Sequence, residues 1–425
     1  MGKKEQEKKE ILKKLKDNKK RNIIIGSILG VLILGIIINH FNTNYIYNDK
    51  ISENIFIENI DVSDMTKEEA LKAINSNKNP ESIYLVYEDV KHEISPEDID
   101  LTYNTNETIE EAYNYTKTDD YFENVKRYFD AKKNRKDIKI KSSYNEAKLS
   151  ESIQDLSKSI NVEMVNAKVY VSSGISYTPS TVGKELDIAS TKESIINNIK
   201  DKQYGEIQLK VNLKEPKVKT EDAQSVNALL GQFTTKFSTN AANRTYNIRT
   251  AAQKGSNILL MPGEEYSYNN LTGMRTRGNG YKDAPVIING KLQDALGGGV
   301  CQVSTTLYNS VLSSGMKLTS ITNHSLASNY VPLGRDAMVN DAGTDFKFKN
   351  PYSNPVFIKI SVGNGTVTSS IYGNAGDKPN LDIYVKTFKV NGLDAADTYR
   401  IYKDSNGKVI EREYIDRSVY KKPKK

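Results

Sequence analysis

Cys301 is the residue of this chain best suited to covalent chemistry, and it is the only cysteine among 425 residues. It follows three glycines, Gly297 to Gly299, and precedes apolar residues that recur at every fourth position, which predicts an amphipathic helix over residues 302–314. A thiol at a helix N-terminus lies close to unsatisfied N–H groups and the positive end of the helix dipole, and both lower its pKa. The glycines allow a tight turn and close approach of a bound group, as an oxyanion site requires. The sequence therefore indicates a nucleophile, with a small buried cysteine as the alternative interpretation.

A thiol nucleophile needs a base beside it. The chain contains three histidines, His40, His92 and His324. Because His324 is the only one within residues 225–374, we predict that it takes the proton of Cys301 and returns it to a leaving amine. Asp336 or Asp345 could orient the ring, and spacing alone does not choose between them. We include Asp336 in the predicted catalytic set.

The first helical turn after the cysteine supplies candidates for an oxyanion site. Gln302 and Ser304, with Thr305 beside them, could hold a negatively charged oxygen through a side chain or a backbone N–H group. Ordinary helix capping is the alternative role for Ser304 and Thr305.

Two arginines are candidates for binding a substrate carboxylate, because the planar guanidinium group matches a carboxylate with two hydrogen bonds. They are Arg244 and Arg335, and Tyr330 is a third candidate for substrate binding. Arg335 could instead form a structural ion pair with its neighbour Asp336.

No metal or other cofactor is expected. One cysteine and one histidine cannot complete a usual zinc site, and the three glycines lack the Lys and Ser or Thr that follow in a phosphate-binding loop.

Several elements must position these residues. We predict a helix from Arg244 through Leu260, a strand and turn at 286–291 that lead into the glycines, and a hairpin of strands 356–362 and 366–372. Farther along, 404–407 has the composition of a turn in a second hairpin.

The N-terminal region predicts a membrane anchor. Residues 1–21 hold ten Lys or Arg and four acidic residues, and Ile23 to Ile38 is an apolar run of sixteen residues. Since the basic side is N-terminal, we expect a cytoplasmic tail at 1–21, a transmembrane helix at 22–40, and the remaining chain on the outer side of the cell membrane. A cleaved signal peptide is the alternative, but residues 39–44 offer no small-residue cleavage site.

The net charge of +7 is therefore concentrated in the tail. The tail carries six of these charges and leaves the rest of the chain nearly neutral, so a nucleic-acid partner is not expected.

The segment after a predicted stalk at 41–53 repeats itself with an offset of 83 residues. Val86-Tyr87 recurs as Val169-Tyr170, each pair within a predicted strand. Pro96 recurs as Pro179, each in a turn between that strand and a predicted helix. Thr108-x-x-Glu111 and Ser190-x-x-Glu193 are predicted capping boxes for the two helices. We therefore predict two tandem α+β repeats, at 54–140 and 141–224.

The repeats resemble the peptidoglycan-binding domain that precedes catalytic domains in many Gram-positive wall enzymes. This resemblance implies that the repeats bind the wall or act as a spacer, and that the chain outside the membrane lies at the cell wall. Residues 225–374 resemble the VanW family in five ordered blocks. These are PGEEYSYN at 262–269, GGGVCQVSTTLYN at 297–309, NH at 323–324, YVPLGRDA at 330–337 and DFKFKN at 345–350. The expected fold class is α+β throughout, with a VanW catalytic domain at 225–374 and a hairpin-like tail at 375–425.

Resemblance to clostridial members of the VanW family implies L,D-transpeptidation, in which peptidoglycan stem peptides are joined by 3-3 cross-links through a thioester on the cysteine. A cysteine endopeptidase or carboxypeptidase would use the same residues and pass the acyl group to water. A noncatalytic wall-binding or scaffold protein would need only the anchor, the repeats and a buried thiol.

Overall fold

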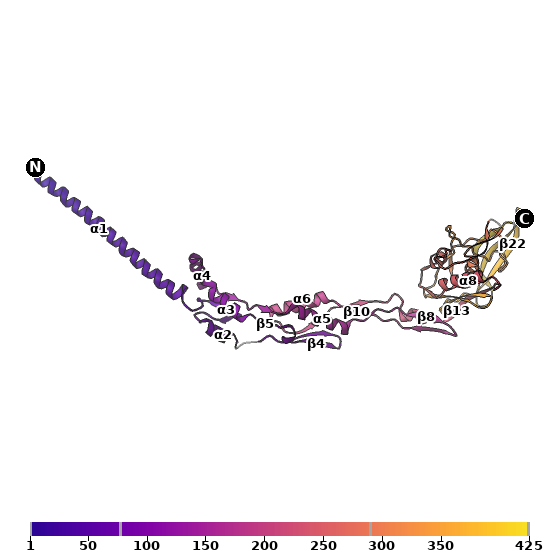
Figure 1. Cartoon of the computed structure of the whole chain (residues 1–425), viewed down its shortest axis with the longest axis horizontal. Helices are drawn as coiled ribbons and strands as arrows, with labels where there is room; N and C mark the ends of the chain where they lie inside the picture. The colour runs from indigo at the N-terminus through magenta and orange to yellow at the C-terminus, as the bar shows by residue number, and fades with distance from the viewer. Residues whose placement is uncertain (1, 76–78, 289–290, 423–425) are drawn as a thin grey trace. The chain divides into compact units, whose positions relative to one another are not determined.

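The computed structural model describes residues 2–75, 79–288 and 291–422, and Figure 1 shows its helices and strands. The fold class is α+β, as predicted. The chain divides into two compact units, each of which is described by itself. Unit 1 contains Met1–Asn161 and Lys184–Leu213, and unit 2 contains Val162–Gly183 and Lys214–Lys425. The domain boundaries expected from the sequence stay a prediction.

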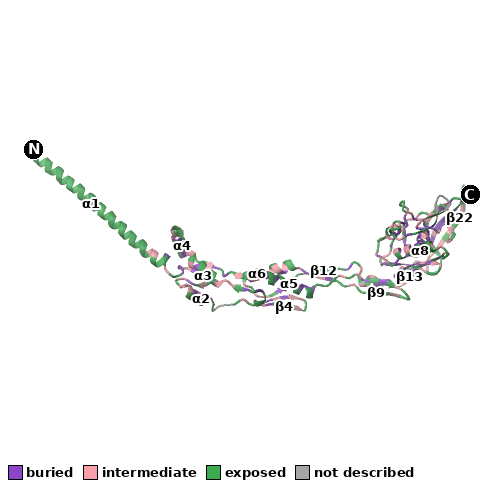
Figure 2. Cartoon of the chain, in the orientation of Figure 1, coloured by how far each residue is buried: buried purple, intermediate pink, exposed green. Residues whose placement is uncertain are grey.

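Unit 1 begins with α1 (Gly2–Phe41), whose residues are exposed along nearly its whole length in Figure 2. The helix is long and apolar enough to cross a membrane. The predicted stalk follows as a π-helix, Asn42–Ile46, and a short irregular segment. Ile46 and Ile51 are both fully buried, so part of this segment packs into the unit.

The rest of unit 1 consists of short sheets with helices packed against them. Its helices are α2 (Lys67–Asn75), α3 (Thr105–Tyr113), α4 (Tyr121–Lys133), α5 (Glu146–Ile160) and α6 (Ile188–Asp201), with 3-10 turns at Glu97–Ile99 and Asn114–Thr116. Its strands are β1 (Ile55–Ile57), β2 (Ile60–Asp61), β3 (Ile83–Tyr87), β4 (Val90–Ile94), β5 (Thr102–Tyr103), β6 (Lys136–Ile138), β7 (Ser142–Ser143) and β11 (Gly205–Gln208). Two further strands, β10 (Gly183–Leu186) and β12 (Val211–Lys214), pair with each other.

The two predicted capping boxes are wrong. Helix α3 begins after Asn104 and helix α6 after Asp187, so both start earlier than the sequence pattern indicated. The carboxylate of Asp187 accepts a hydrogen bond from the backbone of Ser190, while Thr108 lies buried inside its helix. Asn104 and Asp187 occupy the N-cap positions instead, and of these two Asp187 caps its helix through its side chain.

Unit 2 is built around α10 (Val300–Ser313), the helix predicted from the spacing after Cys301. Its helices also include α7 (Thr220–Ser225), α8 (Ala242–Gly255) and α9 (Tyr268–Thr272), with a 3-10 turn at Ala375–Asp377. Its strands are β8 (Lys168–Val171), β9 (Ile175–Thr178), β13 (Ala228–Lys236), β14 (Ile258–Leu260), β15 (Glu265–Ser267), β16 (Asp283–Ile288), β17 (Lys291–Leu296), β18 (Lys317–Ser320), β19 (Lys347–Lys349), β20 (Val356–Val362), β21 (Thr366–Gly373), β22 (Leu381–Val390), β23 (Leu393–Lys403) and β24 (Val409–Tyr420).

Three antiparallel sheets pack around the central helix α10. The first has the order β13-β21-β20-β14, the second β15-β19-β18 and the third β22-β23-β24, while β16 and β17 form a hairpin before the glycines. Val303, Leu307 and Val311 of α10 are fully buried in the same core as Ile248 of α8 and Ile371 of β21. Strands β20 and β21 form the antiparallel hairpin that the sequence predicted.

Two expectations for unit 2 need correction. The predicted helix over 244–260 ends at Gly255, because Asn257 has a positive φ of 61° and residues 258–260 form β14. The central helix is also not amphipathic. From Val300 to Leu312 every residue except Cys301 is buried.

Candidate functional site

The three glycines form the turn that brings the chain into α10. Gly297 and Gly299 have positive φ angles of 82° and 108°, which favour glycine. A side chain at Gly298 would place its Cβ 2.6 Å from the carbonyl oxygen of Ala284 in β16. The turn therefore needs glycine for its conformation and for close packing against the preceding hairpin.

Cys301 is the partly exposed residue of the otherwise buried first turns of α10. Its Sγ atom lies 3.2 Å from the carbonyl oxygen of Val339. Burial by itself raises the pKa of the thiol, but a hydrogen bond with His324 and the charge of that ring lower the pKa below its ordinary value. Arg275 contributes a smaller lowering. The site therefore favours a thiolate.

His324 lies between the thiol and a buried carboxylate. Its Nδ1 atom is 2.6 Å from Oδ2 of Asp336, and the same oxygen accepts the backbone N–H of His324 at 2.6 Å. Since Nδ1 is engaged by the carboxylate, Nε2 is the ring nitrogen left for the thiol. Burial lowers the pKa of His324, whereas the hydrogen bonds with Asp336 and Cys301 outweigh it and raise the pKa to about 10. The two shifts thus favour a thiolate beside an imidazolium ion.

Asp336 is held as an anion in a nearly closed pocket. It is 3% exposed, and burial raises its pKa, but the hydrogen bonds from His324 and from Tyr420 lower it further than burial raises it. The hydroxyl of Tyr420 donates to Oδ1 of Asp336 at 2.5 Å. Asp345, the other sequence candidate, accepts bonds from Ser267 and the backbone of Asn269 instead.

The structure gives the two oxyanion candidates other partners. The side-chain nitrogen of Gln302 donates to Thr235 and to the carbonyl of Lys236, and its oxygen accepts a bond from Arg244. The hydroxyl of Ser304 donates to the carbonyl of Ala337 at 2.7 Å. Both side chains therefore fasten α10 to its surroundings. The backbone N–H of Cys301, in contrast, makes no hydrogen bond to the part of the chain that the structure describes.

Arg244 and Tyr330 lie near the thiol, whereas Arg335 is committed elsewhere. Arg244 donates to Gln302 at 2.6 Å and forms no ion pair with a described carboxylate, and its charge interacts with Tyr330. Burial raises the pKa of Tyr330, and the negative charge of a Cys301 thiolate raises this pKa further. Arg335 donates a hydrogen bond to the side-chain oxygen of Asn309. Its guanidinium carbon also lies 5.4 Å from the centre of the Phe233 ring.

Sequence reasoning missed Arg275 and Tyr420. Arg275 is 8% exposed and pairs with Asp341 at 3.1 Å. Tyr420 lies 84 residues after Asp336, so no local spacing could connect the two. The single signal for Arg275 was its place shortly before the hairpin that leads to the glycines.

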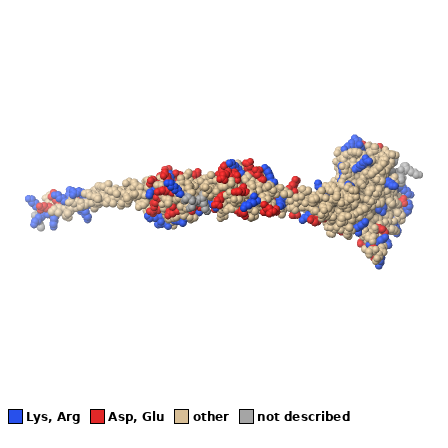
Figure 3. All heavy atoms as spheres, turned by 90° about the horizontal axis from the view of Figure 1, so that it is seen from below, with Lys and Arg blue, Asp and Glu red and all other residues tan. Residues whose placement is uncertain are grey.

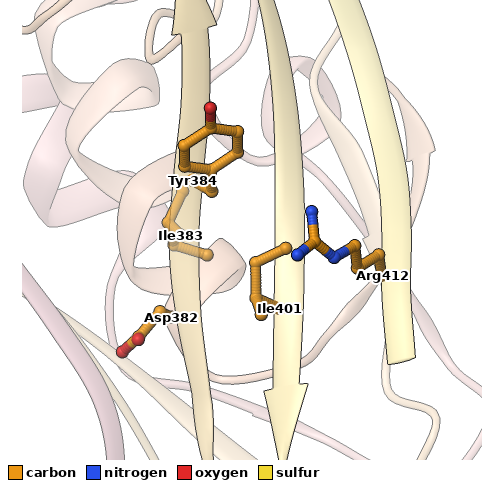
Figure 4. Close-up of a pocket in the computed structure, with 5 residues that line it drawn as sticks. All are labelled: Asp382, Ile383, Tyr384, Ile401 and Arg412. Carbon is orange, nitrogen blue, oxygen red and sulfur yellow. The ribbon is translucent and has the colours of Figure 1, made fainter. Parts of the chain in front are cut away.

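No cluster of three metal-ligating side chains occurs within residues 2–75, 79–288 and 291–422. A surface hollow of about 630 Å³ lies over the third sheet, where Figure 4 shows Tyr384 and Asp382 on β22, Ile401 on β23 and Arg412 on β24. None of the candidate site residues lines it. Since Asp382 pairs with Lys403, its carboxylate already has a partner, and we assign no chemistry to this hollow.

A second hollow, of about 740 Å³, lies in unit 1. Two tyrosines line it, Tyr103 and Tyr204, whose hydroxyls are 2.8 Å apart, together with the ion pair of Glu58 and Lys202.

Comparison with known proteins bears directly on this arrangement. Residues 243–372 match the family described as "VanW like protein", and residues 92–208 match the family described as "Putative peptidoglycan binding domain". The chain is 34% identical over 232 residues to the uncharacterized protein YoaR of Bacillus subtilis (strain 168), and the match covers 53% of this chain and 75% of YoaR. The chain belongs to the VanW family. The family predicted from the five sequence blocks is therefore confirmed.

The chain is also 29% identical over 113 residues to the vancomycin B-type resistance protein VanW of Enterococcus faecalis (strain ATCC 700802 / V583). That match covers 25% of this chain and 41% of the relative. No solved structure matches the chain. Membership of the VanW family together with the peptidoglycan-binding match gives the chain a role associated with the cell wall. The VanW match contains Cys301, His324 and Asp336, and it ends before β22, so Tyr420 lies outside it.

Proposed function

We propose that this VanW protein is an L,D-transpeptidase that joins peptidoglycan stem peptides through a thioester on Cys301. The observation that carries the proposal is the Cys301–His324–Asp336 arrangement at the N-terminus of α10, in which each member contacts the next. A thiolate paired with an imidazolium ion has the nucleophile and the proton donor that acyl transfer from an amide requires.

In the first step, Sγ of Cys301 attacks the carbonyl carbon between an L-centred and a D-centred residue of a stem peptide. The unpaired N–H group of Cys301 and the helix dipole stabilise the oxygen anion that forms. His324 then gives its proton to the departing nitrogen, the C–N bond breaks, and the terminal D-amino acid leaves. The acyl group remains on sulfur as a thioester, and His324 is neutral.

In the second step, the side-chain amine of another stem attacks the thioester carbonyl as a free base. His324 takes the proton from the attacking nitrogen, the C–S bond breaks, and the thiolate beside an imidazolium ion is restored. Asp336 stays ionised throughout and holds the ring with Nε2 toward sulfur.

Arg244 is the residue that we propose to bind a substrate carboxylate. Its guanidinium group is positioned by Gln302 and lacks a carboxylate partner among the described residues. A carboxylate with two oxygens would match its remaining N–H donors. We assign Arg335 a structural role, since its bond to Asn309 fastens α10 to the segment that carries Asp336.

For the whole chain, we propose an uncleaved anchor in α1 with a cytoplasmic N-terminus, and wall binding by unit 1. The basic residues at the far end of α1, followed by an uncharged stretch, are visible in Figure 3 and agree with this topology.

The test is to incubate the full chain in detergent with a purified disaccharide-tetrapeptide and to analyse the products by mass spectrometry. A cross-linked dimer that has lost one terminal residue supports transpeptidation. A shortened monomer alone would show that water is the acceptor, and unchanged substrate would exclude both activities on this compound. The control is Cys301→Ala, which must form neither product.

A further inference from the structure

Strand β24 ends against the segment that carries His324 and Asp336. Three consecutive residues make these contacts. The carbonyl of Val419 accepts a bond from the side chain of Asn323, the hydroxyl of Tyr420 bonds Asp336, and the backbone N–H of Lys421 donates to the carbonyl of Ser325 at 2.7 Å. The residues before and after His324 are therefore attached to the end of β24 and to the residue that follows it.

Tyr420 makes the contact with the most direct chemical effect. It is 3% exposed, its hydroxyl donates to Oδ1 of Asp336, and the same hydroxyl accepts the backbone N–H of Gly334 at 2.7 Å. Asp336 uses its other oxygen, Oδ2, for both bonds to His324. Each oxygen of the carboxylate is thus fixed by a different partner.

We propose that Tyr420 is a positioning residue that holds the carboxylate of Asp336 ionised and aligned for His324, so that β24 completes the site from outside the matched VanW region. The proposal rests on the use of Cys301 and His324 proposed above. Without this hydroxyl, Oδ1 of a buried carboxylate has no donor, which favours its protonated form. A protonated Asp336 supports the imidazolium ion less well, and the thiolate loses its partner.

Other titratable groups interact electrostatically with this site, and the variants compared in a test must leave them unchanged. Those facing Asp336 and His324 are Cys301, Tyr308, Tyr330 and Asp416. The best matched control is Tyr414, which lies on the same strand and is 53% exposed. Tyr414→Phe removes one hydroxyl from β24 without touching the site.

The experiment measures the rate of Cys301 alkylation by iodoacetamide against pH in the full-length protein in detergent. For Tyr420→Phe we expect the midpoint of the thiol titration to move to higher pH and labelling at pH 7 to slow by about threefold or more, with Tyr414→Phe unchanged. A folded Tyr420→Phe protein with the parent profile would overturn the proposal. Because alkylation needs no peptidoglycan, this result is independent of whether transpeptidation is found.

A double-mutant cycle separates positioning from packing. If Tyr420 acts through Asp336, Tyr420→Phe adds no further slowing to Asp336→Asn, whereas additive effects would contradict the proposal. Should Tyr420→Phe fold poorly, a fluorotyrosine at position 420 keeps the shape and strengthens the donor. It is expected to move the thiol titration to lower pH, and an unchanged titration would again count against Tyr420.

Discussion

Cys301 and His324 titrate as one unit, because each favours the charged form of the other. The reactive form, thiolate with imidazolium, exists above the lowered pKa of Cys301 and below the raised pKa of His324, which is about 10. Below the first limit the thiol is protonated, and above the second the ring cannot protonate a leaving amine. We therefore expect activity to fall on both sides of this interval.

Substituting His324 should raise the pKa of the Cys301 thiol. In His324→Gln the thiol loses the hydrogen bond and the charge, and burial then raises its pKa above about 8.5, the ordinary value. We predict that alkylation of Cys301 at pH 7 slows at least about tenfold, as measured by intact mass after timed labelling. His92→Gln, in unit 1, is the control, and equal rates for His324→Gln and the parent would refute the pairing.

Arg244 allows a test of substrate recognition. Arg244→Met removes the guanidinium group that we propose to bind the substrate carboxylate. A hydrogen bond to a charged group is worth about 1.5–3 kcal/mol. We therefore predict that kcat/KM for a disaccharide-tetrapeptide falls about tenfold or more. The matched control is Arg249→Met, an exposed arginine on the same helix. A loss no larger than that of the control would remove Arg244 from the site.

At the residue scale, the sequence predicted the participants by type. A lone cysteine and one nearby histidine left little choice, but Asp336 and Asp345 could be told apart only by the fold. Gln302 and Ser304 lie in the first helical turn, where the sequence predicted them. Their side chains form hydrogen bonds with β13 and with the carbonyl of Ala337, which no local pattern indicates.

At the element scale, α10 is a buried rod whose polar side chains are satisfied by distant segments. Thr306 bonds Thr235 of β13 and Ser310 bonds Ser369 of β21, at 2.8 and 2.7 Å. The four-residue spacing of apolar positions predicted the helix, yet the polar positions between them indicated a solvent face. Burial of those positions follows from hydrogen bonds across 71 and 59 residues, which no local pattern reveals.

The glycine turn before α10 should be intolerant of substitution. In Gly298→Ala the added Cβ would lie 2.6 and 2.7 Å from the carbonyl oxygens of Ala284 and Pro285, so the turn must shift. We predict a loss of about 1–3 kcal/mol in the free energy of unfolding and slower alkylation of Cys301. Gly278→Ala meets nothing closer than 3.9 Å and serves as the control. The prediction is wrong if the two variants unfold at the same temperature.

Arg400 of β23 caps the other end of the helix. It is 1% exposed, and its guanidinium group donates to the carbonyls of Leu312 and Met316 at 2.9 and 2.7 Å. Arg400→Met leaves these carbonyls without donors, and we predict a loss of at least about 2 kcal/mol in thermal or denaturant unfolding. Arg412→Met, an exposed change on β24, should have little effect. Equal stability of the two variants would show that this cap is unimportant.

At the scale of the whole molecule, the sequence predicted an anchor, wall-binding repeats and a catalytic region, and family membership is confirmed. It could not predict how the repeats divide in space. Val169, in the second copy, packs with Phe357 of β20, so hairpin β8–β9 belongs to unit 2. The C-terminal tail was expected to be a hairpin, and β22 adds a third strand to it. Repetition in sequence does not specify which surface a strand will cover.

The central claim is that Cys301 carries the acyl group, and intact-protein mass spectrometry tests it most directly. The full chain is mixed with a disaccharide-tetrapeptide at mildly acidic pH, where thioesters persist, and the reaction is stopped by acid. We predict an added mass equal to the substrate minus its terminal D-amino acid, located on Cys301 by digestion and absent from Cys301→Ala. Cross-linked product formed by Cys301→Ala at the parent rate, or an adduct on another residue, would contradict the account.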